Sequence, residues 1–406
     1  MAQQGFIFKK SGGWYLRYRD DVIVDGQVTR RQQCKRLANV SDQYRTEKDL
    51  QGLRDDVLAP INSGKVKPES TLTVAEFAEG HWLPWARDNC KPSTVAGYET
   101  LWKTYLAPRL QEISLRDFRT VDAANLFAEI HRQHGIGRTT LLHCKSRLSG
   151  IFTLARNQGA LDSPNPIQGA MIPKKAAAPS ETHATTPDEV MAILDVLEKA
   201  GELRARVAVG LMFFAGLRPG EARGALWEDF DGKRLFVRQS VWHTHTTTPK
   251  TAEAAAPVPV IEPLADMLAQ LREADGNPST GPILRGPSGK AVNLDNLSKR
   301  VMIPVLHGCT VCQELKADHT DADHDFIRDA ALPHWHGWYS LRRGVATTLA
   351  GLTRDGMASK GLLRHTNLAT TTRHYVKDVP ENTQAAMIRL ETLFNQCSTG
   401  ATGKPN

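Results

Sequence analysis

Five side chains in the second half of the chain combine residue types that could grip and attack a phosphodiester. Guanidinium groups hold two phosphate oxygens at once and stabilise the charge that builds on them. A lysine can donate a proton to a leaving oxygen, and a tyrosine phenol can form a covalent intermediate without a metal. The five are Arg218 in GLRPGEARGALWEDF, Lys250 in TTTPKTAEAAAPVPV, Arg342 in WYSLRRGVATTLA, and His365 and Tyr375 in LLRHTNLATTTRHYVKD.

Three motifs in this order resemble those of the tyrosine recombinases, the phage-integrase family of DNA strand exchangers. The sequence GLRPGE at 216–221 matches the family's GLR followed by a glutamate three positions on. We expect Glu221 to brace Arg218 rather than to contact DNA. The stretch from Leu363 to Tyr375 resembles the family's LGH, TT and Y elements.

The resemblance implies a role for each of the five side chains. Tyr375 is the nucleophile that forms a 3′-phosphotyrosine link and frees a 5′-hydroxyl for attack on the partner duplex. Arg218 and Arg342 hold the non-bridging oxygens of the transition state. Lys250 is the general acid for the departing 5′ oxygen, and His365 hydrogen-bonds a non-bridging oxygen.

Two positions depart from the family pattern. The second motif is commonly His-x-x-Arg, but Tyr339 stands at the histidine position before Arg342. A tyrosine, with a pKa of about 10, seldom acts as a base at neutral pH, so proton transfer lacks its usual residue. His336, three residues earlier, is a candidate substitute. Arg364 stands where the family usually has glycine.

The implied function is site-specific DNA recombination by an integrase of a phage or other mobile element. The expected partners are double-stranded DNA at its recombination sites, further copies of the chain in a homotetramer, and accessory DNA-bending or directionality factors. Two alternatives stay open: a DNA-binding protein of the same fold with weakened or lost catalysis, and an enzyme similar to type IB topoisomerases. An apolar helical stripe that would dock into a neighbouring protomer, or pack on its own domain, comprises Met387, Leu390, Leu393 and Phe394.

Composition sets the broad class of protein. A length of 406 residues predicts two or three domains, and a formal net charge of +7 favours a polyanionic partner. The N-terminus has no apolar signal segment, and no stretch approaches the roughly 20 apolar residues of a bilayer span. We therefore expect a cytoplasmic protein with no membrane partner. The six cysteines are too scattered for a disulfide framework.

The predicted fold class is α+β, mainly α, in three domains. Residues 1–62 alternate aromatic or β-branched with polar residues, which predicts a small β-rich sheet similar to an arm-type DNA-binding domain. Residues 70–168 predict an all-α domain similar to the SAM-like core-binding domain, and residues 182–397 a catalytic domain with a small antiparallel sheet. The first domain carries basic residues that could contact DNA or form a solvated face: Lys9, Lys10, Arg17, Arg19, Arg30, Arg31, Lys35 and Arg36.

Apolar periodicity predicts helices at 120–134, 137–158, 262–274 and 293–306. Ser93 is expected as the N-cap of an earlier helix. Four cations of the helical domain are candidate phosphate contacts, although solvated helix charges explain them equally well: Lys103, Lys145, Arg147 and Arg156.

A cysteine and histidine cluster lies at 307–336, before Arg342. Cys309 and Cys312 form a C-x2-C pair, and His319 and His324 follow as H-x4-H, a ligand set that suits tetrahedral zinc. The spacer between the pairs is shorter than in the common zinc finger. The alternative is two buried free thiols and a histidine-rich acidic loop. We expect a structural zinc rather than a catalytic one, with no cofactor for the phosphoryl transfer, and substitute ligands could be His307, Asp323 and His336.

Overall fold

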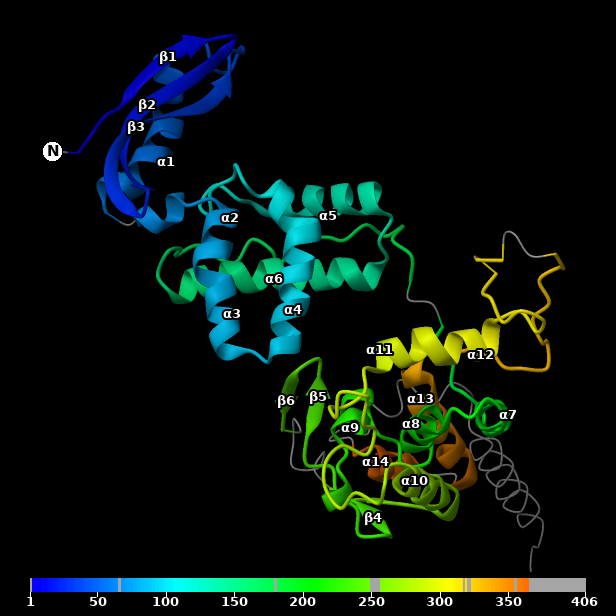
Figure 1. Ribbon diagram of the computed structural model, residues 1–406. Helices are drawn as coiled ribbons and strands as arrows, with labels where there is room; N and C mark the ends of the chain where they lie inside the picture. The colour runs from blue at the N-terminus through cyan, green and yellow to red at the C-terminus, as the bar shows by residue number, and fades with distance from the viewer. Residues whose placement is uncertain are drawn as a thin grey trace, which may run out of the picture. The chain divides into compact units, whose positions relative to one another are not determined.

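The chain forms two compact units, Met1–Ser180 and Glu181–Asn406 (Figure 1). Within the described part of the chain, no helix combines the length and the apolar character that a membrane crossing requires. The computed structural model describes residues 2–64, 67–178, 181–248, 256–316, 318–319, 323–353 and 356–364.

The first unit begins with an antiparallel sheet of β1 (Phe6–Lys10), β2 (Gly13–Val24) and β3 (Gln27–Asn39), in that order. Its turns fall at Gly12 and Gly26, whose φ angles of 71° and 76° favour glycine. One face of the sheet packs on α1 (Gln51–Asn62), because alternate side chains of β2 point to the same side. The core between them is formed by Ile7, Trp14, Leu16, Tyr18, Leu50 and Leu58.

A helical bundle completes the first unit. Its two longest helices, α5 (Thr120–His134) and α6 (Arg138–Asn157), confirm the predicted helices. The N-cap predicted at Ser93 is wrong: α4 (Pro92–Leu101) begins after Lys91, because a proline fits the first helical position with its φ already set. The shorter α2 (Val74–Phe77) and α3 (Leu83–Asn89) join them around a core that includes Phe77, Trp102, Phe127 and Phe152.

Two of the four cations considered as phosphate contacts in the bundle are used within the protein. The Lys145 ammonium donates to the carbonyl of Ala170, and the Arg147 guanidinium lies 4.1 Å from the centre of the Tyr98 ring. Lys103 and Arg156 are exposed. These two are therefore the better placed of the four to meet a ligand in solvent.

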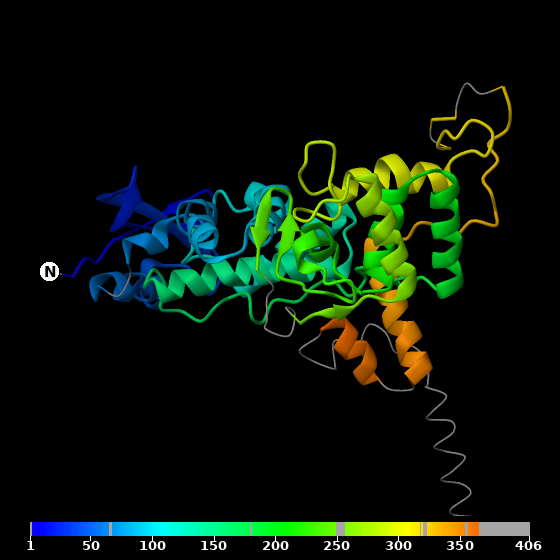
Figure 2. The ribbon, with the colours of Figure 1, turned by 60° about the horizontal axis from the view of Figure 1, so that its bottom comes forward.

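The second unit is organised around α8 (Leu203–Phe213), which is buried along most of its length because it is apolar on all sides. It packs against α7 (Pro187–Lys199), α10 (Glu262–Ala274) and α13 (Trp338–Thr353). Figure 2 shows α13 and α14 (Gly356–Leu363) side by side in orange. The mainly α class with small antiparallel sheets is confirmed.

Short elements complete the second unit. The predicted helix at 293–306 appears as α11, one π-helical turn and α12 in succession. The small sheets are two-stranded, one of β4 with β7 and one of β5 with β6. The short helices and strands of this unit are α9 (Pro219–Gly224), α11 (Leu294–Leu297), α12 (Ile303–His307), β4 (Arg234–Leu235), β5 (Ser240–Trp242), β6 (His245–Thr247) and β7 (Val258–Pro259).

Candidate active site

The described residues include part of the predicted catalytic set. Arg218, Arg342 and Tyr339 are among them. Lys250, His365 and Tyr375 lie outside the described residues, as does the apolar stripe at 387–394. Lys250 belongs to the connection between β6 and β7, and His365 directly follows the described Arg364. The described part of the site therefore consists of the arginines and the residues that contact them.

Arg218 is held by the glutamate three residues later. It occupies the N-cap position of α9, and the Glu221 carboxylate accepts from its backbone N–H at 2.9 Å and from Nη1 at 2.7 Å. Glu221 is buried, whereas 35% of the Arg218 side chain is exposed. The prediction that Glu221 braces Arg218 is confirmed. The guanidinium is fixed on one side and accessible from the other, as binding of an anion requires.

Arg364, at the position where glycine was expected, pairs with the same carboxylate. Its Nη2 lies 2.5 Å from Oε2 of Glu221, and both side chains are almost fully buried. The backbone of Arg364 has a φ of 52°, a left-handed conformation that suits glycine better than arginine. Among the described residues, its Nε and Nη1 are buried without a hydrogen-bond partner. The sequence singles out this arginine but does not indicate its partner.

Charge and burial have opposite effects on the pKa values of Glu221 and Arg364. Burial alone would raise the pKa of Glu221, but the positive charges of Arg364 and Arg218 hold it below its ordinary value. Burial lowers the pKa of Arg364, and the charge of Glu221 opposes that change. Glu221 is therefore an ionised, buried anchor for two guanidinium groups.

Arg342 joins the three motif segments. Its Nη1 donates to the carbonyl of Gly216 in the first motif, and its Nη2 donates to the carbonyl of Leu363 in the third, at 2.6 Å. Gly216 has a φ of 59°, and a Cβ there would lie 3.2 Å from Cδ2 of Leu363. The close approach and the two hydrogen bonds bring Arg218, Arg342 and Arg364 into one region, although 146 positions separate the first from the last.

Tyr339, at the family's histidine position, is exposed, whereas His336 stacks on another ring. Tyr339 is on the first turn of α13 with 57% of its surface exposed. The ring of His336 stacks on that of His183 at 3.9 Å, and burial together with neighbouring positive charge lowers the pKa of His336. His183 in turn contacts the Glu189 carboxylate at 2.9 Å. One face of the His336 ring is thus occupied by a contact that the sequence did not suggest.

The segment before α7 fixes α13, and with it Arg342. The backbone N–H of Thr185 donates to the carbonyl of Ser340 at 3.1 Å, and their hydroxyls are 2.7 Å apart. A Cβ on Gly344 would lie only 1.9 Å from the carbonyl oxygen of Thr185. Gly344 therefore positions the site by permitting this approach. The only sign of this role in the sequence is that a glycine lies inside a long helix.

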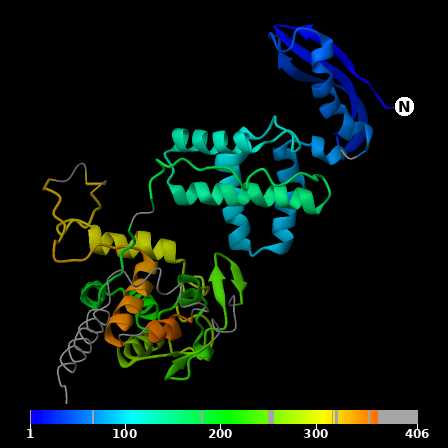
Figure 3. The ribbon, with the colours of Figure 1, turned by 180° about the vertical axis from the view of Figure 1, so that it is seen from behind.

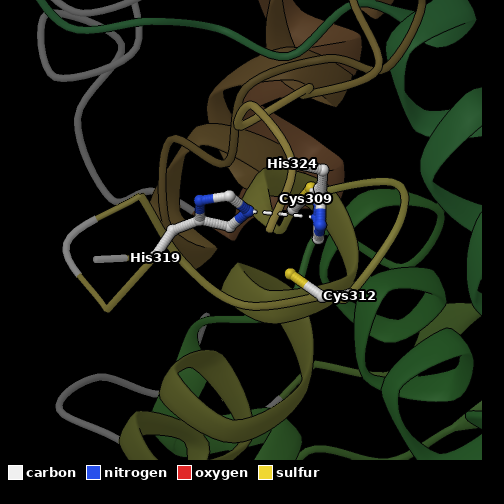
Figure 4. Close-up of side chains that lie close together, drawn as sticks. All are labelled: Cys309, Cys312, His319 and His324. Carbon is white, nitrogen blue, oxygen red and sulfur yellow. Dashed lines mark hydrogen bonds between the residues drawn. The ribbon is translucent and has the colours of Figure 1, made fainter. Parts of the chain in front are cut away.

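The predicted cysteine and histidine cluster is assembled in the loop between α12 and α13. The ligand atoms of Cys309, Cys312, His319 and His324 all lie within 4.8 Å of one another (Figure 4). Of the substitutes considered, Asp323 contacts His324, whereas Nε2 of His307 accepts from the backbone N–H of Trp335. The four residues of the C-x2-C and H-x4-H pairs are thus the ones that the fold brings together.

Comparisons with known proteins show what the whole chain is similar to. No family model matches the chain. A protein named tyrosine recombinase XerC-like, from Caldanaerobacter subterraneus subsp. tengcongensis, is 23% identical over 370 residues, which are 86% of this chain and 90% of the relative.

Solved structures of two integrases share the fold. The Tn1549 transposon integrase in complex with circular intermediate DNA has a TM-score of 0.61 at 18% identity, over 79% of this chain and 100% of that one. The lambda integrase tetramer bound to a Holliday junction has a TM-score of 0.54 at 17% identity, over 91% of this chain and 94% of that one. The fold is therefore that of the DNA integrases. In its motifs the chain resembles the tyrosine recombinases, and its sequence is similar to that of a protein named as one.

Proposed function

We propose that the chain is a site-specific recombinase that integrates and excises a phage or other mobile element through a covalent link to Tyr375. The observation that carries the proposal is the pair of hydrogen bonds from Arg342 to the carbonyls of Gly216 and Leu363. These hydrogen bonds bring together motifs that are far apart in the sequence. Arg218, partly exposed beside them, offers a guanidinium to a phosphate.

The reaction follows from the chemistry of these groups. The Tyr375 oxygen attacks phosphorus, the bond from phosphorus to the 5′ oxygen breaks, and Lys250 gives that oxygen a proton. A 5′-hydroxyl of the partner duplex then attacks the phosphotyrosine and releases the phenol. Each step exchanges one phosphoester for another, so no external energy source is needed. Arg218 and Arg342 stabilise the charge on the non-bridging oxygens in both steps.

The duplex substrate and the assembly form part of the same proposal. The sequence relative is named a recombinase, and the similar integrases were solved on DNA, one of them as a tetramer on a Holliday junction. We propose that this chain likewise acts as a homotetramer on double-stranded DNA at its recombination sites, with accessory DNA-bending or directionality factors.

The N-terminal sheet supplies a second DNA-binding surface in this proposal. On the face opposite α1, Phe8 stacks on Tyr15, with Arg17 over Phe8 and Arg36 over Tyr15. Stacked rings hold the guanidinium groups in place at the surface, where they can meet phosphates or bases.

Replacing both of these arginines tests the sheet face. We expect Arg17→Ala with Arg36→Ala to weaken DNA binding, because fewer phosphates are neutralised. The slope of log affinity against log salt concentration should become shallower by about 1 for each phosphate that the variant no longer neutralises. Arg54→Ala on α1 is the control, and equal weakening by it would remove the sheet face from the proposal.

A nicked suicide substrate tests the catalytic proposal. Its sequence comes from the DNA that flanks the gene, since an integrase commonly lies beside its own recombination site. We expect a covalent protein–DNA adduct that is absent in Tyr375→Phe. DNA binding without an adduct would favour the inactive binding protein, and an adduct on any supercoiled plasmid, with relaxation but no strand exchange, would favour the topoisomerase.

A further inference from the structure

The loop between α12 and α13 has almost no hydrophobic core. Between Leu306 and Trp338, Cys309 is the only described residue among the buried apolar side chains. The loop extends away from the helices of the second unit in Figure 1 and, seen from behind, in Figure 3. A segment of this length needs another source of order, and a bound metal is a common one where apolar burial is lacking.

The geometry of the loop points to a structural zinc ion, and we propose that Cys309, Cys312, His319 and His324 bind it as a tetrahedral S2N2 site. All four ligand atoms lie within 4.8 Å of one another. Figure 4 shows the two thiols and the two imidazoles converging from different parts of the loop. The inference is independent of the proposed recombinase function.

The distances within the cluster match those of a zinc site. With Zn–S of about 2.3 Å and Zn–N of about 2.0 Å, tetrahedral geometry puts S and N ligands about 3.5 Å apart and two N ligands about 3.3 Å apart. Sγ of Cys309 is 3.4 Å from Nε2 of His324, and Nε2 of His319 is 3.2 Å from the same atom. Two of the ligand pairs are therefore already spaced for one central ion.

The neighbours of the ligands prepare them to bind a cation. Nδ1 of His324 lies 3.0 Å from the Asp323 carboxylate, which favours the proton on Nδ1 and leaves the Nε2 lone pair facing the cluster.

The turn that carries the cysteines is fixed by the backbone. The N–H of Gln313 donates to the carbonyl of Cys309 at 2.8 Å, and the N–H of Cys309 donates to the carbonyl of Glu314 at 2.8 Å. Gly308 permits this turn, because a Cβ there would lie 2.4 Å from the carbonyl oxygen of Pro304. The end of the loop is tied to α12 by Arg328, whose Nε donates to the carbonyl of Leu306.

The chemistry of the set favours a structural ion over a catalytic one. Four protein ligands complete a tetrahedral shell and leave no open position for water or substrate. The Cys312 thiol donates to the Glu314 carboxylate, with Sγ 3.9 Å from Oε2. Binding of a divalent ion would displace that proton and balance the charge of the two cysteine ligands.

Metal analysis of the full-length, untagged protein, purified under reducing conditions without chelator, tests the site. We expect about one zinc ion per chain, and a loss of at least tenfold in Cys309→Ser with Cys312→Ser. Cys34→Ser with Cys90→Ser removes two thiols outside the cluster and should keep the ion. Less than about a tenth of an equivalent in the wild type after zinc is supplied, or equal zinc in both double variants, would overturn the proposal.

A second measurement keeps the test decisive if the cysteine variant does not fold. Cobalt(II) replaces zinc in the wild-type protein, and we expect a tetrahedral spectrum with sulfur-to-metal charge transfer. His319→Gln, at a half-buried position of the loop, should weaken the metal affinity while the melting temperature of the rest of the protein is kept. An octahedral cobalt spectrum without a sulfur band, or a disulfide between Cys309 and Cys312 in the reduced preparation, would contradict the site.

Discussion

Glu221 and Arg364 form a buried ion pair across 143 positions of sequence, with Nη2 2.5 Å from Oε2. Because the same carboxylate holds Arg218, one anion aligns two cations that the sequence separates widely. Removing one partner of such a pair leaves an uncompensated buried charge, which is a large cost. The pair therefore fixes the end of α14, and the start of the segment that leads to His365, against the first motif.

Replacing Glu221 by glutamine should reveal this anchor. We expect Glu221→Gln to reduce the free energy of unfolding by about 3 kcal/mol, because two guanidinium groups lose their counter-charge in a buried site. Thermal or urea unfolding of the full chain measures the change. Glu273→Gln, at an exposed position in the same unit, is the control and should change stability by less than about 0.5 kcal/mol.

The stability difference between the wild type and this variant should depend on pH. The pKa of Glu221 in the folded protein is depressed, so its contribution is fully present above the unfolded pKa of about 4.3 and is lost as pH falls through the folded value. The stability difference between the wild type and Glu221→Gln should therefore be constant near neutral pH and shrink below about pH 4.3. A difference that stays constant down to acid unfolding would show that Glu221 is not the ionised anchor.

Two variants of Arg364 separate the effect of the ion pair on stability from the effect of the backbone strain. Its φ of 52° suits glycine, so Arg364→Gly removes the pair and relieves the strain, whereas Arg364→Ala removes the pair and keeps it. We expect the alanine variant to be less stable than the glycine variant by about 1 kcal/mol. We also expect Arg364→Gly to cost less than Glu221→Gln, because Glu221 keeps Arg218 as a partner. Equal melting temperatures for the two Arg364 variants would contradict the strained backbone.

Local and distant contacts differ in how well the sequence predicts them. Glu221 lies three residues after Arg218 at a helix start, so their contact could be predicted from spacing alone. The contact of Glu221 with Arg364 depends on how α9 and α14 pack, and no periodicity or motif encodes it. The N-cap at Ser93 was wrong for a local reason, since Pro92 competes for the first turn. The proximity of the cysteine and histidine pairs was predictable because paired residues on short turns are a local pattern.

Gly344 should be essential for the position of α13. Its Cβ would lie 1.9 Å from a backbone oxygen of Thr185, which cannot move aside as a flexible side chain could. We expect Gly344→Ala to lower the free energy of unfolding by about 3 kcal/mol and to displace Arg342. Gly351→Ala is a matched control on the same helix, where a Cβ meets nothing within 4 Å, and should stabilise the helix by up to about 1 kcal/mol. Similar melting temperatures for the two variants would contradict the close packing.

Lys250 should act on the leaving group rather than on binding. A 5′ oxygen needs a proton as it departs, whereas a sulfur at the same bridging position leaves readily as a thiolate. We expect Lys250→Ala to slow cleavage of normal DNA by about 10²–10⁴-fold and to slow cleavage of the sulfur-substituted DNA far less. Lys233→Ala, an exposed lysine of the same unit, should leave both rates unchanged. Single-turnover cleavage of the two suicide substrates gives the comparison, and equal slowing on both would assign Lys250 to phosphate binding instead.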